Sequence, residues 1–268
     1  MTRILALLLL ALASFGTQAQ SRFDQSHAVW NALLGKHVHW NATSTASSVN
    51  YAGFKNDRVT LNTYLATLSA VKSSDFNHWS VNEQRAFLIN AYNAYTVELI
   101  LTKYPNIKSI KDLGSLFSSP WSKPFFTLLG EKRSLDDIEH TLLRGNPDFD
   151  EPRIHFAVNC ASVGCPALRP EAYRAGTLDK QLEEQTKRFL SDHSRNRYDK
   201  SKDTLFLSSI FKWYGDDFGK AKTAKNLAEF LSHYAGSLGM TASEQTRLIH
   251  RELDIEFLDY DWTLNKER

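Results

Sequence analysis

Ser80-Val81-Asn82-Glu83 opens the strongest helix signal in the sequence, and Pro105 ends it. Ser80 and Glu83 have the spacing of a capping box, in which each side chain bonds the backbone N–H of the other residue at a helix start. Proline disfavours a helical residue before it, so the helix has to end there. Apolar side chains nearly encircle the stretch between these limits: Phe87, Leu88, Ala91, Ala94, Tyr95, Leu99 and Leu101. The sequence therefore predicts a central, buried helix over residues 83–104.

Two asparagines, Asn90 and Asn93, lie three residues apart on this predicted helix and therefore share one face. A buried side-chain amide has to find hydrogen-bond partners, or it costs stability. The segment 153–159 offers partners because its apolar and polar residues alternate, which is typical of a strand, with His155 and Asn159 on the polar face. We expect the two asparagines to meet this face. Two more polar side chains are expected nearby: Glu139 and His140.

The remaining segments predict a single mixed α/β domain with more helix than strand and a small central sheet. Residues 197–208 have the pattern of a hairpin, and residues 254–264 that of an extended segment. No linker of domain-separating length interrupts residues 55–264. Helical spacing and capping signals recur in four further stretches: 134–144, 177–190, 222–236 and 242–251.

The composition excludes several classes of protein. The 268 residues are 42% hydrophobic and 23% charged, which excludes a disordered chain and a collagen-like repeat. Two cysteines are too few for a disulfide-dense scaffold. Lys and Arg number 32 against 30 Asp and Glu, for a net charge of +2. This balance is unsuited to binding nucleic acid phosphates by charge, so we expect no nucleic acid partner.

Residues 1–19 have the pattern of a secretory signal peptide. Arg3 is followed by an apolar run over residues 4–13, and Thr17-Gln18-Ala19 forms a small-x-small exit. The run is shorter than the roughly 20 residues that span a bilayer. The sequence predicts cleavage after Ala19 and a mature protein that begins at Gln20, without a transmembrane segment. We expect this protein to be exported, to the periplasm or beyond the cell.

Cys160 and Cys165 are the two cysteines of the chain. An exported protein meets an oxidising compartment, and Gly164 could bend the intervening residues so that the two sulfurs meet. We therefore predict a Cys160–Cys165 disulfide. A free catalytic thiol and two buried unpaired thiols are the alternatives. Two thiols alone do not make a structural zinc site.

Four stretches of the sequence have a distinctive order and spacing. They are Phe87-Leu88-Ile89-Asn90-Ala91-Tyr92-Asn93-Ala94, Leu135-Asp136-Asp137-Ile138-Glu139-His140, Arg153-Ile154-His155-Phe156-Ala157-Val158-Asn159-Cys160-Ala161-Ser162-Val163-Gly164-Cys165-Pro166 and Asp259-Tyr260-Asp261-Trp262-Thr263-Leu264-Asn265. The third is the most specific, because a short segment ending in Cys-x4-Cys-Pro is seldom met by chance. Together the four stretches resemble the family catalogued as domain of unknown function 547. The resemblance runs over residues 75–265 and implies the limits of this domain, with no established chemistry. We expect residues 20–74 to form an N-terminal helical and loop segment packed on it.

One interpretation of these residues is a hydrolase or transferase that uses a thiol. A cysteine nucleophile needs a base within hydrogen-bond reach and a group that orients the base. The catalytic candidates are His155, Cys160, Asn159, Asn90 and Asn93. Papain-like and transglutaminase-like folds present their cysteine at the start of a buried helix, where this chain carries Asn90. A distant relative of such a fold is therefore compatible with the sequence, and a standard thiol triad is not favoured.

The alternative is a non-catalytic binding module whose cysteine pair is a structural or redox-labile disulfide. Aromatic and polar side chains would then line a groove for a small molecule, a peptide or a glycan. The binding candidates are Glu139, His140, Trp213, Tyr214 and Asp261. The histidines form no H-E-x-x-H motif, and no spacing rule joins Glu139, His140 and His155, so we predict no metal site. No motif identifies a cofactor.

Overall fold

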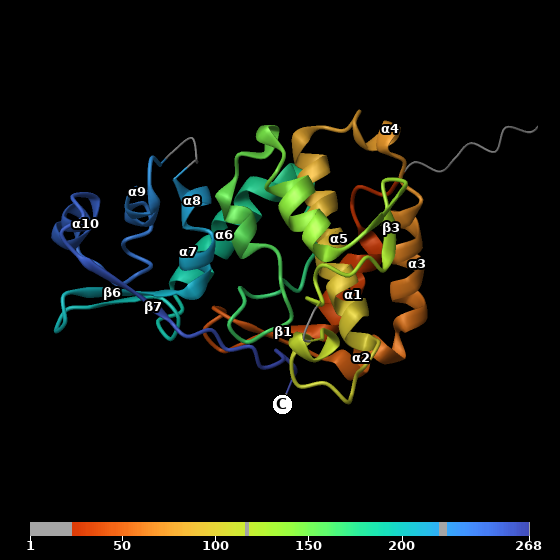
Figure 1. The fold of residues 1–268 in the computed structure, drawn as a ribbon, viewed down its shortest axis with the longest axis horizontal. Helices are drawn as coiled ribbons and strands as arrows, with labels where there is room; N and C mark the ends of the chain where they lie inside the picture. The colour runs from red at the N-terminus through yellow and green to blue at the C-terminus, as the bar shows by residue number, and fades with distance from the viewer. Residues whose placement is uncertain (1–22, 116–117, 220–223, 268) are drawn as a thin grey trace, which may run out of the picture.

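The computed structural model describes residues 23–115, 118–219 and 224–267. It is a single domain of mixed helix and strand, as predicted, in which helix predominates (Figure 1). The predicted signal peptide, residues 1–19, lies outside the described residues. Within the described ranges, no helix is long and apolar enough to cross a membrane.

Ten α-helices occur in the described part of the chain, and one of them is much longer than the others. They are α1 (Ala28–His37), α2 (Tyr51–Asn56), α3 (Arg58–Ser69), α4 (Ser73–Phe76), α5 (Val81–Leu101), α6 (Leu178–Leu190), α7 (Ser209–Trp213), α8 (Gly215–Phe218), α9 (Leu227–Ser232) and α10 (Ala242–Ile249). Shorter turns of other helix types join them: the 3-10 helices η1 (Ile110–Leu113), η3 (Pro147–Phe149), η4 (Pro152–Phe156) and η5 (Ala175–Thr177), and the π-helix η2 (Asp137–Leu143).

The strands of the described residues form three small sheets. Two are antiparallel pairs, β1 (Val38–Trp40) with β2 (Ser47–Val49) and β3 (Phe126–Leu128) with β4 (Glu131–Arg133). The third has the order β5-β6-β7, with β5 (Arg197–Asp199), β6 (Thr204–Ser208) and β7 (Asp254–Leu258). The β5–β6 hairpin confirms the prediction for residues 197–208, and β7 joins it in parallel.

Helix α5 is the central helix that the sequence predicts. The capping box is present, with Glu83 N–H donating to Ser80 Oγ at 3.3 Å and Ser80 N–H donating to Glu83 Oε2 at 2.8 Å. Phe87, Leu88 and Ala94 are fully buried. Neighbouring positions on the other sides of the helix are buried as well, so α5 has no wide solvent face over its middle turns. The apolar residues all round this helix therefore indicate burial rather than amphipathicity.

Two adjoining hydrophobic cores hold the domain together. The larger one packs around α5 and includes residues of α1, α2 and α3, while the second lies among α6 to α10 and the three-stranded sheet. Figure 1 shows this division, with α6 between the two groups of elements. Phe156 belongs to the second core and its neighbour Ala157 to the first. The segment that leads to the cysteines therefore lies where the cores meet.

The predicted strand over residues 153–159 is wrong, because residues 152–156 form the 3-10 helix η4. Pro152 occupies the first turn of this helix, where its fixed φ favours a helical start. The Glu151 side chain accepts a hydrogen bond from the Arg153 N–H at 3.2 Å and caps the same turn. His155 is as buried as Ile154, with 3% exposure each. The alternation of polar and apolar residues therefore does not separate a core face from a solvent face.

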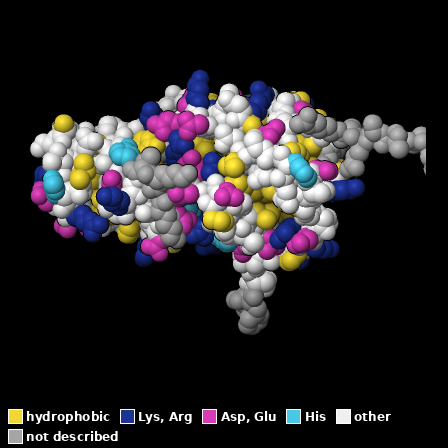
Figure 2. Space-filling model, turned by 90° about the horizontal axis from the view of Figure 1, so that it is seen from above, with side chains coloured by type: hydrophobic (Ala, Val, Ile, Leu, Met, Phe, Trp, Pro, Cys, Tyr) yellow, Lys and Arg dark blue, Asp and Glu magenta, His cyan; other side chains and the backbone are white. Residues whose placement is uncertain are grey.

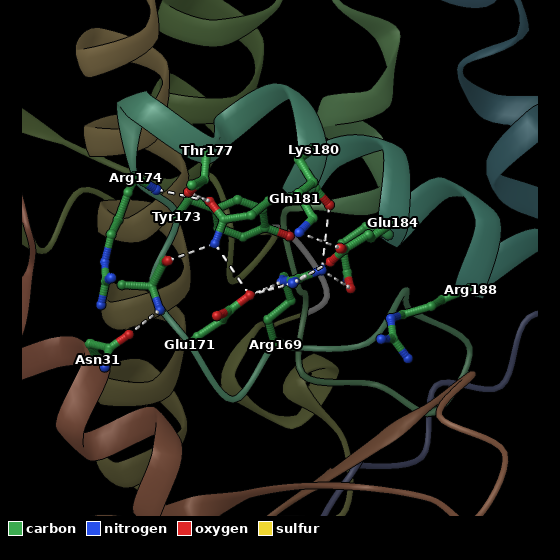
Figure 3. Close-up of polar contacts among 12 residues, drawn as sticks. Asn31, Arg169, Glu171, Tyr173, Arg174, Thr177, Lys180, Gln181, Glu184 and Arg188 are labelled. Carbon is green, nitrogen blue, oxygen red and sulfur yellow. Dashed lines mark hydrogen bonds and ion pairs between the residues drawn. The ribbon is translucent and has the colours of Figure 1, made fainter.

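A polar network centred on Arg169 fastens α6 to the rest of the domain (Figure 3). The Arg169 guanidinium is 5% exposed and lies between the carboxylates of Glu171 and Glu184, with Glu184 Oε2 at 2.8 Å. Gln181 of α6 donates to the Ala172 carbonyl at 2.9 Å. These bonds fix the start of α6, and through it the segment that follows the cysteines. On the face seen in Figure 2, Lys and Arg side chains are interspersed with Asp and Glu side chains.

Candidate functional site

The two asparagines of α5 pair with backbone groups as a strand would. Asn90 donates from Nδ2 to the Tyr173 carbonyl at 2.8 Å and accepts from the Tyr173 N–H at 3.0 Å. Asn93 donates to the Ala157 carbonyl at 3.0 Å and accepts from the Asn159 N–H at 2.8 Å. Each amide thus bonds one carbonyl and one N–H of an irregular segment. Without the asparagines, these backbone groups would be buried in the core with no hydrogen-bond partner. Asn93 meets the predicted segment, whereas Asn90 meets a different one.

A third asparagine, Asn159, closes the loop that carries both cysteines. We call residues 159–166 the Cys loop. Asn159 Oδ1 accepts from the Ala161 N–H at 3.0 Å, and its Nδ2 donates to the Pro166 carbonyl at 2.7 Å. The two ends of the loop are therefore tied together by one side chain. Ala161 has a positive φ of 62°, a conformation that is strained for alanine and that this clamp helps to hold.

The C-terminal segment, residues 259–265, runs along the outside of the Cys loop. The Val163 N–H donates to the Thr263 carbonyl and the Gly164 N–H to the Asp261 carbonyl, each at 2.8 Å. A Cβ on Gly164 would lie 3.0 Å from the Asp261 backbone nitrogen, so this close approach requires glycine. The pairing places two aromatic side chains of this segment, Tyr260 and Trp262, beside the cysteines.

The two cysteines are adjacent free thiols in this structure, with their Sγ atoms 2.9 Å apart. Cys160 is partly exposed and Cys165 is buried. The hydrogen bond from the Cys165 thiol lowers the pKa of Cys160 below its ordinary value and outweighs the effect of burial. Ser162 and Tyr260 contribute further hydrogen bonds to Cys160 Sγ, each at 3.1 Å. Burial instead raises the pKa of Cys165, so Cys160 is the thiol that ionises first.

A cavity of about 290 Å³ opens above the cysteines. Its lining comes from six parts of the chain: α5, the segment before β3, η2 with the residue before it, the stretch from η4 through the Cys loop, α7 with the residue after it, and the C-terminal segment. The lining residues are Tyr92, Trp121, Asp136, Glu139, His140, His155, Val158, Cys160, Cys165, Pro166, Ile210, Trp213, Tyr214, Tyr260 and Trp262.

Four aromatic side chains make one wall of the cavity, and we call them the aromatic wall: Trp121, Trp213, Tyr260 and Trp262. The Trp213 and Trp262 rings stack with centroids 5.7 Å apart, and Tyr260 lies 4.5 Å from Trp262. Trp121 meets Trp262 edge to face at 5.7 Å. Lys111 Nζ lies 3.8 Å from the centroid of the Trp262 ring, which is the geometry of a cation–π contact. The wall thus already holds one ammonium group.

A second part of the lining is acidic and comes from η2 and the residue before it. Glu139 is 7% exposed and accepts a hydrogen bond from the Tyr214 hydroxyl at 2.8 Å. His140 Nδ1 lies 2.9 Å from Arg144 Nη1. Arginine can only donate, so Nδ1 is the acceptor in this contact. Burial raises the pKa of Asp136 above its ordinary value.

His155 forms the side of the cavity and contacts the ion pair of Arg144 and Asp217. Its Nε2 lies 2.8 Å from Asp217 Oδ2, and its ring stacks on Tyr214 with centroids 4.1 Å apart. Arg144 binds the same carboxylate at 2.5 Å. Burial alone would raise the pKa of Asp217, but the hydrogen bonds from His155 and Arg144 hold it well below its ordinary value. The contacts of the His155 ring are thus with Asp217 and Tyr214 rather than with a thiol.

The structure brings together seven of the residues that the sequence singled out: His155, Cys160, Cys165, Glu139, His140, Trp213 and Tyr214 line the cavity. Asn90, Asn93 and Asn159 are not among the lining residues, and their side chains form hydrogen bonds with the backbone instead. Asp261 lines a separate surface hollow beside the Cys loop. No group of three metal-binding side chains gathers anywhere in the described residues. Sequence reasoning missed five lining residues that carry polar or aromatic groups: Tyr92, Trp121, Asp136, Tyr260 and Trp262.

These observations define a helix-rich α/β domain with an aromatic and acidic cavity over a pair of thiols. Residues 76–190 match the family model described as protein of unknown function, DUF547, the family that the sequence resembles. The match contains α5, η2, the Cys loop and α6, and it ends before α7 and the C-terminal segment. No curated protein and no solved structure matches the chain.

Proposed function

We propose that the cavity is the active site of a thiol-dependent enzyme that exchanges disulfides, with Cys160 as the attacking thiolate and Cys165 as the resolving thiol. The observation that carries this proposal is the 2.9 Å contact between the two Sγ atoms at the floor of a cavity. Cys160 is the partly exposed cysteine of the pair, and it is also the one with the lowered pKa.

The reaction has two steps, and its electrons balance within substrate and protein. The Cys160 thiolate attacks one sulfur of a substrate disulfide, so a mixed disulfide forms and one substrate thiolate leaves. Cys165 then loses its proton to that thiolate or to water and attacks Cys160 Sγ. The second substrate thiolate leaves and the Cys160–Cys165 disulfide forms. The substrate is reduced by two electrons and the protein dithiol is oxidised by two. The predicted disulfide is thus the oxidised state of this cycle.

A thiol hydrolase is less well supported by the contacts. Acyl transfer needs a base in hydrogen-bond reach of the nucleophile. The hydrogen-bond partners of Cys160 Sγ are Cys165, Ser162 and Tyr260, and the His155 imidazole bonds Asp217 instead. A non-catalytic binding module is the second candidate, and the aromatic wall favours it. The two candidates differ in whether the thiols react.

The test uses reduced protein and bis(2-hydroxyethyl) disulfide, a neutral disulfide. Wild-type protein is expected to release two equivalents of 2-mercaptoethanol and to lose two hydrogens in intact mass. Cys165→Ser should stop at the mixed disulfide on Cys160, and Cys160→Ser should not react. A wild-type protein that keeps both thiols in excess disulfide would contradict the exchange and support the binding module.

The pH dependence of alkylation tests the thiolate directly. The Cys165 hydrogen bond lowers the pKa of Cys160, so iodoacetamide should modify wild-type Cys160 at a pH below the ordinary range of cysteine. Cys165→Ala removes the donor and should move the midpoint of the pH–rate curve upward. Cys165→Ser keeps a hydroxyl donor at the same place and serves as the matched control. Equal midpoints for the wild type and the alanine variant would show that Cys165 does not tune Cys160.

Export is the second part of the proposal. The pattern of residues 1–19 supports cleavage after Ala19, and an oxidising compartment would supply disulfides to this site. N-terminal sequencing of the protein from the native host should begin at Gln20, in the periplasmic or the culture fraction. Recovery of the full chain, starting at Met1, from the cytoplasm would be the opposite result.

A further inference from the structure

The charges around the cavity are unbalanced. Two carboxyl groups, on Asp136 and Glu139, line it together with the Cys160 sulfur, and none of the described lysines or arginines is among the lining residues. Arg144 is near, but its ion pair is with Asp217, at 2.5 Å. A ligand that fits this cavity should therefore bring positive charge.

Glu139 is the lining carboxylate that a positive charge on the ligand would stabilise most. It is 7% exposed, and none of the described lysines or arginines forms a salt bridge with it. Its one hydrogen-bond donor among the described side chains is the neutral Tyr214 hydroxyl. Burying a carboxylate costs free energy unless a cation or several hydrogen bonds compensate it. A bound cation would supply that compensation.

The aromatic wall is suited to the same kind of group. Aromatic faces attract ammonium groups through the ring quadrupole, most strongly on tryptophan. Lys111 already places its ammonium 3.8 Å from the Trp262 ring centre, from outside the cavity lining. Trp213 is 46% exposed and presents further ring surface at the cavity. Aromatic faces and a buried carboxylate in one cavity are together suited to an organic cation.

We infer that the cavity recognises substrates that carry an alkylammonium group next to the reacting sulfur. The inference rests on the proposed disulfide exchange and names its substrate class: a disulfide flanked by a primary or quaternary amine, as on a small amine disulfide or a lysine-flanked cystine peptide. The ammonium lies between Glu139 and the aromatic wall, and the disulfide then faces Cys160 Sγ. This arrangement holds the substrate sulfur close to the nucleophile.

The first experiment compares three disulfides of similar size and different charge: cystamine, which is cationic, bis(2-hydroxyethyl) disulfide, which is neutral, and 3,3′-dithiodipropionate, which is anionic. The rate of Cys160 oxidation is measured for each, and the ratio of cystamine to neutral disulfide is compared between variants, so that differences in leaving group cancel. Glu139→Gln keeps the acceptor for Tyr214 and should lower this ratio about fivefold to tenfold. Trp213→Leu should lower it as well. Asp216→Asn, an exposed carboxylate outside the cavity lining, is the control and should leave it unchanged.

The second experiment separates the cation site from the disulfide chemistry. Tetramethylammonium chloride should slow alkylation of Cys160 by neutral iodoacetamide, sodium chloride at equal concentration should not, and Trp213→Leu should abolish the protection. If the protein reduces the neutral disulfide but shows neither protection nor a Glu139-dependent preference for cystamine, the inference is overturned and the exchange activity stands. If tetramethylammonium protects but no disulfide reacts, the cation site stands and the proposed exchange is wrong.

Discussion

Asn93→Ala is expected to lower the free energy of unfolding by about 2–5 kcal/mol, because it orphans two buried backbone groups that each cost about 1–3 kcal/mol. The groups are the Ala157 carbonyl and the Asn159 N–H, which the Asn93 amide bonds at 3.0 and 2.8 Å. Urea denaturation of the reduced protein at neutral pH measures the loss. Asn82→Ala is the control, since Asn82 is exposed near the start of the same helix and its removal should cost less than about 0.5 kcal/mol.

The same variant also distinguishes a structural amide from a functional one. If Asn93 served mainly a pocket, its replacement would leave stability unchanged or improve it, because functional sites carry strain. A melting temperature equal to that of the wild type would therefore contradict the structural role. In folded Asn93→Ala protein, the pH midpoint for alkylation of Cys160 by iodoacetamide should also change. The reason is that Asn159 begins the Cys loop, and its N–H has lost its hydrogen bond to Asn93.

Features with local causes could be predicted from the sequence. The start of α5 depends on Ser80 and Glu83, three residues apart, and its burial is visible in the apolar residues on every side. The need of Asn90 and Asn93 for partners could be predicted too, because a buried amide is costly without them. Which partners they find depends on the path of distant chain: Tyr173 lies 83 residues after Asn90.

The error at residues 153–159 has a physical reason. Alternation predicts a strand only where one face is solvated, and here both faces are buried between two cores. In the same way, the aromatic wall joins Trp121, Trp213 and Trp262, which no periodicity relates. The signal that could have indicated it lies in the fourth family-like stretch, where Tyr260 and Trp262 flank the candidate Asp261. Aromatic side chains that alternate along an extended segment share one face, and that face is the cavity.

Leu88→Ala should cost about 2–5 kcal/mol of unfolding free energy, the range for a cavity that its surroundings cannot fill. Leu88 is fully buried in α5, and its neighbours Phe87 and Ile89 are fully buried as well, so no nearby solvent-facing side chain can move into the space. Val59→Ala on α3 is the matched control: Val59 is 81% exposed, and its truncation should change stability by less than about 0.5 kcal/mol. A loss below about 1 kcal/mol for Leu88→Ala would mean that α5 is peripheral.

The pH midpoint of Cys160 alkylation distinguishes Leu88→Ala from Asn93→Ala. Leu88 packs in the larger core and makes no polar contact with the Cys loop, so its truncation should lower stability and leave the alkylation midpoint of Cys160 unchanged in the folded protein. Asn93→Ala should change both quantities, because its amide holds the backbone from which the loop begins. Helix α5 therefore has two roles, which different residues carry: its apolar side chains stabilise the fold, and its asparagines position the thiols.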